Sequence, residues 1–324
     1  MVKRKIPSNR PFDLASEPSS GSCKPSSTSP YVILATLLTI TTRLNSSINS
    51  INQAKLDFTQ YRKSNCCTMT PRIIPEAGNA PNVSYDAQQA YSILKSGGVI
   101  IVPTDVGYAL MASTQAGVQR IFAAKGRRQG HNIGIIGTYR QHREIHMLPE
   151  AKFEMTRVLT EDSGMIVGII AKFDTKRLPP RLARLDPTTL SQVTQGDTVS
   201  IAVPEGPFLR ELGQLCDADP EGLLMFGTSA NRTGQGQQFR VEDIDPVVIA
   251  SVDLVVDYGL QKWHLYGRGG VNFDAENMRV LRMGAGYEIF RDRIIRWFPH
   301  LLEEAGVSLD KDPEHRISDP GVRC

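Results

Sequence analysis

Short runs of apolar residues alternate along the chain with segments whose apolar residues recur at helical spacing. The run Val99 to Val102 is the clearest, because it follows a Gly-Gly pair and stops at Pro103, which predicts a short buried strand. Thr104 and Asp105 then fall in the loop at the end of that strand. Strand ends and helix ends that carry polar groups commonly build ligand sites in α/β proteins, so this loop is a first candidate.

Helices are predicted on both sides of that strand. Residues 85–94 place their apolar side chains on one stripe, which stops at a Gly-Gly pair. Residues 114–125 carry a second stripe, with Gly126 in the position of a C-terminal cap. Lys125 and Arg127 therefore stand at a helix end.

The same two patterns predict the remaining elements. Strands are expected at 133–137, 165–173, 198–203, 223–227, 254–256 and 278–282, and helices at 140–160 with a break at Pro149, 207–216, 241–250 and 286–305. Residues 174–196 are rich in Pro and Arg and are expected to form a loop. The alternation of strands and helices predicts an α/β fold with a twisted mixed β-sheet flanked by helices.

The first 72 residues differ in composition from the rest. They hold ten Lys and Arg against three acids, a charge of +7, so the remaining 252 residues carry −4. This basic, Ser- and Thr-rich composition is typical of an organelle transit segment, and a disordered tail is the open alternative. The apolar run at 31–40 is too short to span a bilayer, so no membrane partner is expected. The expected location is cytoplasmic, or mitochondrial if the segment is a transit peptide.

Three parts of the chain are expected. They are a basic N-terminal segment at 1–75, one α/β domain at 82–300 and a loose polar tail at 305–324. The mildly acidic remainder argues against a general electrostatic nucleic-acid binder. The five cysteines include no C-x-x-C pair, so neither a disulfide framework nor a zinc site is expected, and a reducing compartment fits best.

Lys125 and Arg127 are the first candidates for chemistry. Cations at a helix end can simply offset the helix dipole. The Lys-x-Arg pattern also suits a polyanion, because Lys supplies a point charge and Arg a bidentate fork. Arg128 adds a third charge, and Gly126 and Gly130 leave the backbone accessible.

Three other segments place polar or basic side chains at strand ends. Residues 228–231 follow a buried strand and can form either a tight turn that faces a ligand or an ordinary Asx-type turn. Thr104 can contact a substrate or cap its own turn. Arg282 can meet a phosphate or pair with an acid. Each of these signals is ambiguous when taken alone.

Taken in order over residues 82–295, these motifs resemble those of the YrdC/Sua5 family. Family members carry a strand ending in Pro-Thr-(Asp/Glu)-Thr, then an aromatic residue, Lys-x-Arg-Pro, and later Ser-Ala-Asn followed by Gly. The matching motifs are Pro103-Thr104-Asp105 with Tyr108, Lys125-Gly126-Arg127, Ser229-Ala230-Asn231 with Gly234, Asp253 to Gly259, and Leu281-Arg282-Met283-Gly284. The resemblance implies a YrdC/Sua5-like (RibB-like) fold.

The well-studied members of this family are threonylcarbamoyl-AMP synthases. The resemblance therefore implies a nucleotidyltransferase that makes threonylcarbamoyl-AMP from L-threonine, bicarbonate and ATP, with Mg²⁺ on the nucleotide, and releases pyrophosphate. The product is the donor for t6A modification of tRNA. The resemblance thus implies tRNA or tRNA-modifying proteins as indirect partners, and double-stranded RNA binding as a further property.

The resemblance also assigns roles to individual residues. Lys125 and Arg127 are expected to be catalytic, because they would neutralise charge that builds on phosphate and carboxylate oxygens. The expected nucleotide-binding residues are Thr228, Ser229, Asn231 and Arg282, and the expected amino-acid-binding residues are Thr104 and Tyr108.

Several neighbouring positions depart from the family pattern. These departures are Val106, Ala109, Arg128, His131-Asn132-Ile133, Ser163 to Val167, Pro204 and Gly269-Gly270. Two alternatives therefore stay open: a divergent paralogue that uses another amine substrate, or a non-catalytic nucleotide- or RNA-binding module on the same fold.

His142 and His146 form a separate signal, because their i, i+4 spacing on a predicted helix can bind a metal. No third ligand is evident in the sequence. A solvated helix face is therefore expected, and no metal site.

Overall fold

Most of the predicted elements are present in the computed structural model, which describes residues 70–127, 131–204 and 206–309. These ranges lie in one compact unit of the chain, residues 68–324. The expectations for the basic N-terminal segment and the C-terminal tail concern mainly residues outside these ranges. Within the described ranges, every helix is too short or too polar to cross a membrane.

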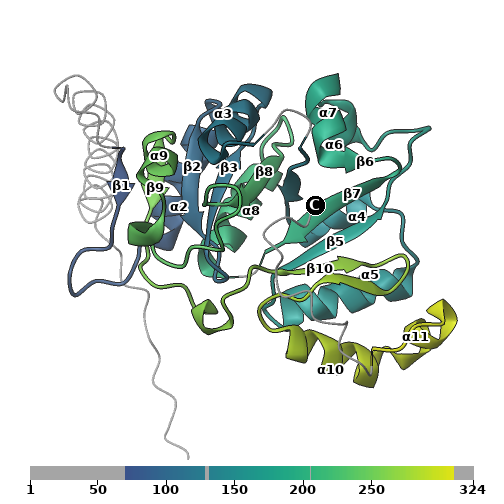
Figure 1. Ribbon diagram of the computed structural model, residues 1–324. Helices are drawn as coiled ribbons and strands as arrows, with labels where there is room; N and C mark the ends of the chain where they lie inside the picture. The colour runs from purple at the N-terminus through teal and green to yellow at the C-terminus, as the bar shows by residue number, and fades with distance from the viewer. Residues whose placement is uncertain (1–69, 128–130, 205, 310–324) are drawn as a thin grey trace, which may run out of the picture. The chain divides into compact units, whose positions relative to one another are not determined.

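The predicted strands and helices occur in the expected order, and further short elements that were not predicted stand between them (Figure 1). The strands are β1 (Arg72–Ile73), β2 (Val99–Pro103), β3 (Tyr108–Ala112), β4 (Gly134–Ile136), β5 (Val167–Lys172), β6 (Thr194–Gln195), β7 (Thr198–Val203), β8 (Met225–Ser229), β9 (Leu254–Val256), β10 (Val271–Asp274) and β11 (Arg279–Arg282). The helices are α2 (Val83–Lys95), α3 (Gln115–Lys125), α4 (Tyr139–Ile145), α5 (Glu150–Arg157), α6 (Pro180–Ala183), α7 (Pro187–Val193), α8 (Pro207–Asp217), α9 (Pro246–Ala250), α10 (Tyr287–Trp297) and α11 (Pro299–Ala305).

All of these strands join one mixed sheet, as the alternation of elements predicts. Its order is β1-β9-β2-β3-β8-β4-β7-β5-β10-β11, with β6 paired to β7. Parallel pairs such as β2 with β9 stand beside antiparallel pairs such as β3 with β8. The sheet is strongly twisted, so that β2, β3 and β8 run at a steep angle to β5, β7 and β10 (Figure 1).

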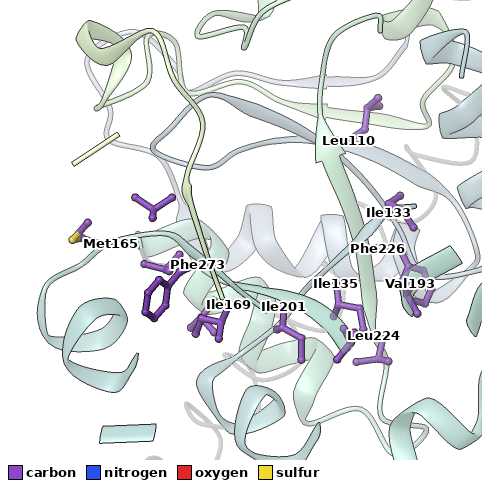
Figure 2. Packing of buried hydrophobic residues seen from close by; sticks show 14 of the residues in the cluster. Leu110, Ile133, Ile135, Met165, Ile169, Val193, Ile201, Leu224, Phe226 and Phe273 are labelled. Carbon is purple, nitrogen blue, oxygen red and sulfur yellow. The ribbon is translucent and has the colours of Figure 1, made fainter. Parts of the chain in front are cut away.

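Helices cover both faces of this sheet, because consecutive side chains of a strand point to opposite faces. In β2, Val99 and Ile101 belong to one buried cluster, which includes the apolar stripe of α3. Ile100 and Val102 belong to a second cluster, which α2 and α8 complete. Figure 2 shows the first cluster extending across the sheet through residues such as Ile135 on β4, Ile201 on β7 and Phe273 on β10.

Strand β3 has no counterpart in the sequence prediction. It pairs antiparallel with β2, with Pro103 opposite Tyr108, so residues 104–107 form the tip of a hairpin. Both faces of β3 are buried, which removes the alternation that reveals a strand. The residue types at 105 and 107 do indicate a turn. Asp105 (φ 61°) and Gly107 (φ 129°) have positive φ angles, which Asp tolerates and Gly favours.

Two further predictions need correction, and proline explains both. Residues 174–196 contain α6, α7 and β6 rather than an uninterrupted loop. Pro180 and Pro187 occupy the first turns of these helices, where a missing N–H costs nothing, and Asp186 caps α7. The closing segment 286–305 is two helices, because Pro299 cannot continue α10 and begins α11 instead.

The expected solvated face around His142 and His146 is wrong. Both side chains are buried, and their Nδ1 atoms lie 2.6 Å apart. His146 Nε2 must donate to the Val199 carbonyl 3.1 Å away, and in a neutral pair His142 Nδ1 then donates to His146 Nδ1. His142 Nε2 is left to accept from the Thr156 hydroxyl at 3.0 Å, and it shares that single proton with the Phe153 carbonyl at 2.8 Å. The network thus satisfies two uncharged imidazoles inside the core.

This network predicts an acid-sensitive fold. Burial lowers the pKa of His142 to about 2 and that of His146 to about 4, from an ordinary value of 6.5. Below pH 6.5 the unfolded chain therefore takes up protons that the folded pair excludes, so stability falls as pH falls. The loss reaches about 1.4 kcal/mol per pH unit for each histidine.

The test compares the wild type with the double variant His142→Asn/His146→Asn by denaturant unfolding from pH 8 to pH 5. The wild type should be more stable at pH 8, and the difference should shrink as the pH falls. Two parallel pH profiles would contradict the prediction.

Gly284 marks a close backbone approach at the end of the sheet. A Cβ atom there would lie 2.5 Å from the carbonyl oxygen of Gly270 and closer still to the backbone of Val271. We therefore expect Gly284→Ala to lower the free energy of unfolding by about 2 kcal/mol or more, because backbone cannot yield as a side chain can. Gly236→Ala is the control, since its Cβ would meet nothing within 4 Å. Equal stability of the two variants in urea unfolding would refute this packing.

Candidate active site

The end of α3 fixes the positions of the two predicted catalytic cations. Thr114 caps the start of this helix by accepting from the Gly117 N–H. Gly126 ends it in the left-handed conformation (φ 65°), as the sequence predicts. This turn reverses the chain directly after Lys125, which is buried, and brings Arg127, which is half-buried, onto the end of β8.

Lys125 is held by residues 228–231, which form the end of β8 and the bend after it and are called here the β8 turn. Its Nζ donates to the Asn231 carbonyl at 2.6 Å, to Asn231 Oδ1 at 3.0 Å and to the Ser229 carbonyl. Three acceptors match the three N–H groups of an ammonium ion. Burial, followed by the charge of Arg127, lowers the pKa of Lys125 to about 6. The three acceptors oppose this effect and favour the charged ammonium form, so the side chain is a structural link between α3 and β8.

The β8 turn is fixed further by its own side chains. The Ser229 hydroxyl donates to Asn231 Oδ1, the same oxygen that accepts from Lys125. Asn231 Nδ2 donates to the carbonyls of Arg232 (2.9 Å) and Gln235. The backbone N–H of Ala230 donates to the Tyr108 carbonyl at 2.9 Å. These bonds hold the two polar side chains in one arrangement.

Arg127 approaches the β8 turn from its other side. Its Nη2 donates to Thr228 Oγ1 at 3.1 Å, and its Nη1 lies 3.5 Å from the Asn132 carbonyl. The structure therefore brings together five of the predicted residues, Lys125, Arg127, Thr228, Ser229 and Asn231. Arg128, the third expected cation, lies outside the described residues.

The two predicted amino-acid-binding residues have internal partners. Thr104 is buried, and its hydroxyl donates to the Gly107 carbonyl at 2.7 Å, which closes the hairpin turn. The Tyr108 hydroxyl lies 2.8 Å from the Gly259 carbonyl and 3.1 Å from Asp257 Oδ1. Burial, together with the nearby Asp257 charge, raises the pKa of Tyr108. Both side chains thus stabilise the loops around the site by hydrogen bonds to loop carbonyls.

Arg282 lies apart from this group, at the end of β11. It donates from Nε (3.1 Å) and Nη2 (2.9 Å) to the Gly270 carbonyl, and from Nη2 to Asn272 Oδ1. Gln237 connects the two regions, because its Nε2 donates to the Tyr108 carbonyl at 3.0 Å. Its Oε1 would lie 3.5 Å from a Cβ atom placed on Gly269. The sequence offered no motif that singles out Gln237.

A cavity lies beside the hairpin tip, at the loop of Thr104 and Asp105 that the sequence indicates as a first candidate for a ligand site. Its volume is about 230 Å³, and one carboxylate and one cation, Asp105 and Lys262, line it together with the start of α8. Burial raises the pKa of Asp105, while the charge of Lys262 lowers it by a smaller amount. The sequence signal for this place is the pair of polar residues that directly follows β2, whereas the contribution of Lys262 depends on long-range folding.

The chemistry of the site is that of a cationic, oxygen-rich turn. Lys125 and Arg127 supply positive charge, and Thr228, Ser229 and Asn231 supply hydroxyl and amide groups. Such groups suit phosphate and carboxylate oxygens rather than a directly bound metal. Over the described residues, no group of three or more His, Cys, Asp or Glu side chains could hold a metal ion.

Comparisons with known proteins agree with this fold. Structures similar to this chain include a hypothetical protein from Streptococcus mutans, with 21% sequence identity, a TM-score of 0.57, and coverage of 71% of this chain and 96% of that chain. A P. abyssi Sua5 variant is 19% identical with a TM-score of 0.51. That match covers 67% of this chain and 57% of the Sua5 chain, so this chain spans little more than half of that protein. At these identities the likeness shows the fold.

No curated protein sequence matches the chain. The family model for Sua5, YciO and YrdC proteins, described as telomere recombination, matches residues 92–284, which is more than half of the chain. The matched range includes the α3 end, the β8 turn and Arg282. The chain therefore belongs to the Sua5/YciO/YrdC family.

Proposed function

We propose that this protein is an ATP-dependent carbamoyl-adenylate synthase that makes threonylcarbamoyl-AMP. One observation supports the proposal above all: Lys125 and Arg127, at the end of α3, converge on the Ser-Ala-Asn turn that follows β8. Two cations and a fixed set of short polar groups suit the charged oxygens of a nucleotide and a carbamate. Family membership adds that such proteins include threonylcarbamoyl-AMP synthases.

The proposed reaction has two steps. The amine of L-threonine takes up CO₂ from bicarbonate and loses a proton, which gives an N-carboxylate. A carboxylate oxygen then attacks the α-phosphorus of ATP, the α–β anhydride bond breaks, and pyrophosphate leaves with its electron pair. Because both reactants are anions, holding them in line and neutralising their charge is the main task of the site.

The proposed roles follow from where each side chain lies. Arg127 faces the β8 turn and would neutralise charge on the phosphate or carboxylate oxygens. Lys125 would act chiefly by positioning the β8 turn, since its three hydrogen bonds all go to that turn. Thr228, Ser229 and Asn231 would orient the nucleotide, and Arg282 would approach its phosphates. Mg²⁺ would enter on the triphosphate and neutralise part of its charge.

A second candidate keeps this chemistry but uses another amine. Two observations favour it: the Thr104 hydroxyl is engaged with Gly107, and Tyr108 is fully buried. Positions 269 and 270, where family members carry Ser and Thr, are glycines here. A Thr side chain at 270 would press on the Ile166 carbonyl, because a Cβ atom there would lie 2.9 Å from that oxygen. The nucleotide end of the site is therefore better supported than its amino-acid end, and tRNA is proposed only as an indirect partner.

The direct test incubates the full chain with ATP, Mg²⁺ and bicarbonate, and with each amino acid in turn. We expect equal amounts of pyrophosphate and threonylcarbamoyl-AMP, measured by a coupled assay and by mass spectrometry, and no product when bicarbonate is left out. Turnover with a different amino acid instead of L-threonine would select the second candidate. ATP binding without turnover for any amino acid would refute an enzyme and indicate a nucleotide-binding module.

A matched pair of variants separates positioning from charge neutralisation. Lys125→Met and Arg127→Met remove one cation each, two residues apart, and both should lower kcat about 100-fold or more. Only Lys125→Met should also lower the free energy of unfolding, by about 1–3 kcal/mol, because it leaves buried carbonyl oxygens without donors. Full turnover in both variants would show that the site is wrongly assigned. Wild-type stability in Lys125→Met would show that Lys125 does not hold the β8 turn.

A further inference from the structure

Arg268 lies on the segment that leads into β10, directly before Gly269 and Gly270, called here the glycine pair. Its Nη1 atom is buried and has no hydrogen-bond partner among the residues that the structure describes. Neither the sequence motifs nor the proposed mechanism assigns this side chain a role. The role of this cation is therefore an open question.

A buried guanidinium N–H without an acceptor is unfavourable. Arginine stays protonated in proteins, so it cannot escape the cost of burial by losing its charge. A charged donor left without a partner destabilises the fold by more than a neutral one does. Such groups are uncommon in folded proteins, and an anionic ligand is one of the few things that satisfies them.

The surroundings of the glycine pair provide further donors. Arg282, from β11, donates to the Gly270 carbonyl and is exposed on its strand. Its hydrogen-bond acceptors within the described ranges are a carbonyl oxygen and the amide oxygen of Asn272. A Cβ atom on Gly269 would lie 3.5 Å from Gln237 Oε1 and 3.7 Å from Arg282 Nη2, which is ordinary contact, so both side chains lie beside this residue. Arg268 therefore directly precedes the glycine pair, and Arg282 lies beside it.

The glycine pair is connected to the β8 turn through Tyr108. The Tyr108 carbonyl accepts from Gln237 Nε2 and also from the Ala230 N–H of the β8 turn. Gln237 in turn reaches the space beside Gly269. A single extended ligand with negative charge at both ends could therefore contact Arg127 at one end and the two arginines at the other.

We propose that Arg268 and Arg282 together bind the pyrophosphate portion of the nucleoside triphosphate. Two guanidinium groups offer several forked N–H donors, which suit the oxygens of a diphosphate better than the two oxygens of one carboxylate. Arg268 would then assist the departure of pyrophosphate by donating hydrogen bonds that stabilise the negative charge developing on it. This assignment rests on the proposed function for the identity of the nucleotide, but the anion site itself does not.

The test measures binding of pyrophosphate, ATP, AMP and L-threonine to the full chain by isothermal titration calorimetry. Arg268→Met should weaken binding of pyrophosphate and ATP about 10-fold or more, and should leave AMP within about twofold. Arg279→Met is the matched control, because Arg279 is exposed on the same hairpin and its loss removes the same charge. Unchanged pyrophosphate affinity in Arg268→Met, or loss confined to L-threonine, would overturn the proposal.

The Tm of the ligand-free protein distinguishes a binding role of Arg268 from a structural one, because the two roles predict changes of opposite sign in Arg268→Met. Removing the buried N–H group that has no acceptor should raise the Tm of Arg268→Met, and pyrophosphate should stabilise this variant less than it stabilises the wild type. A lower Tm together with weaker binding of all four ligands would mean that Arg268 only supports the fold. Pyrophosphate binding without any acyl-adenylate formation would refute the proposed function and leave the anion site intact.

Discussion

The link between Lys125 and the β8 turn is the interaction on which the rest of the site depends. An ammonium group in the core requires acceptors, and the main-chain oxygens of a turn more than a hundred residues away supply them. The Lys125 carbonyl also accepts from the Thr233 N–H at 3.0 Å, so backbone and side chain hold the same segment. Because Gly126 reverses the chain directly afterwards, the position of Arg127 follows from this link.

The link continues into the rest of the sheet. The β8 turn donates to the Tyr108 carbonyl through Ala230, and the Tyr108 side chain reaches the loop that follows β9. In that loop, Asp257 accepts from the Gly259 N–H and from Arg72. One chain of hydrogen bonds therefore joins α3, β8, β3 and β9. This arrangement preorganises the polar groups of the site before any ligand binds.

Local patterns predict the elements of this fold, but they do not predict its long-range contacts. The run Val99 to Val102 and the cap at Gly126 depend on neighbouring residues only, and both are confirmed. The burial of Lys125 depends on oxygens brought together by folding, so the sequence indicates an ordinary helix-end cation. The prediction of a solvated face at His142 and His146 is wrong for the same reason, since these side chains bond to partners on other elements. Strand β3 was hidden because both of its faces are buried.

The motif residues divide into two groups according to where their donors point. Thr104 directs its hydroxyl at the Gly107 carbonyl, and Tyr108 and Asp257 meet each other and Gly259, so their place in the motifs reflects how the loops are held. Arg127 and Arg282 place guanidinium groups beside hydroxyl, amide and carbonyl oxygens of two connected regions. Positive charge in two connected regions favours a ligand that is anionic along its length. A triphosphate fits that requirement better than an amino acid alone, which is why the nucleotide is the firmer part of the proposed function.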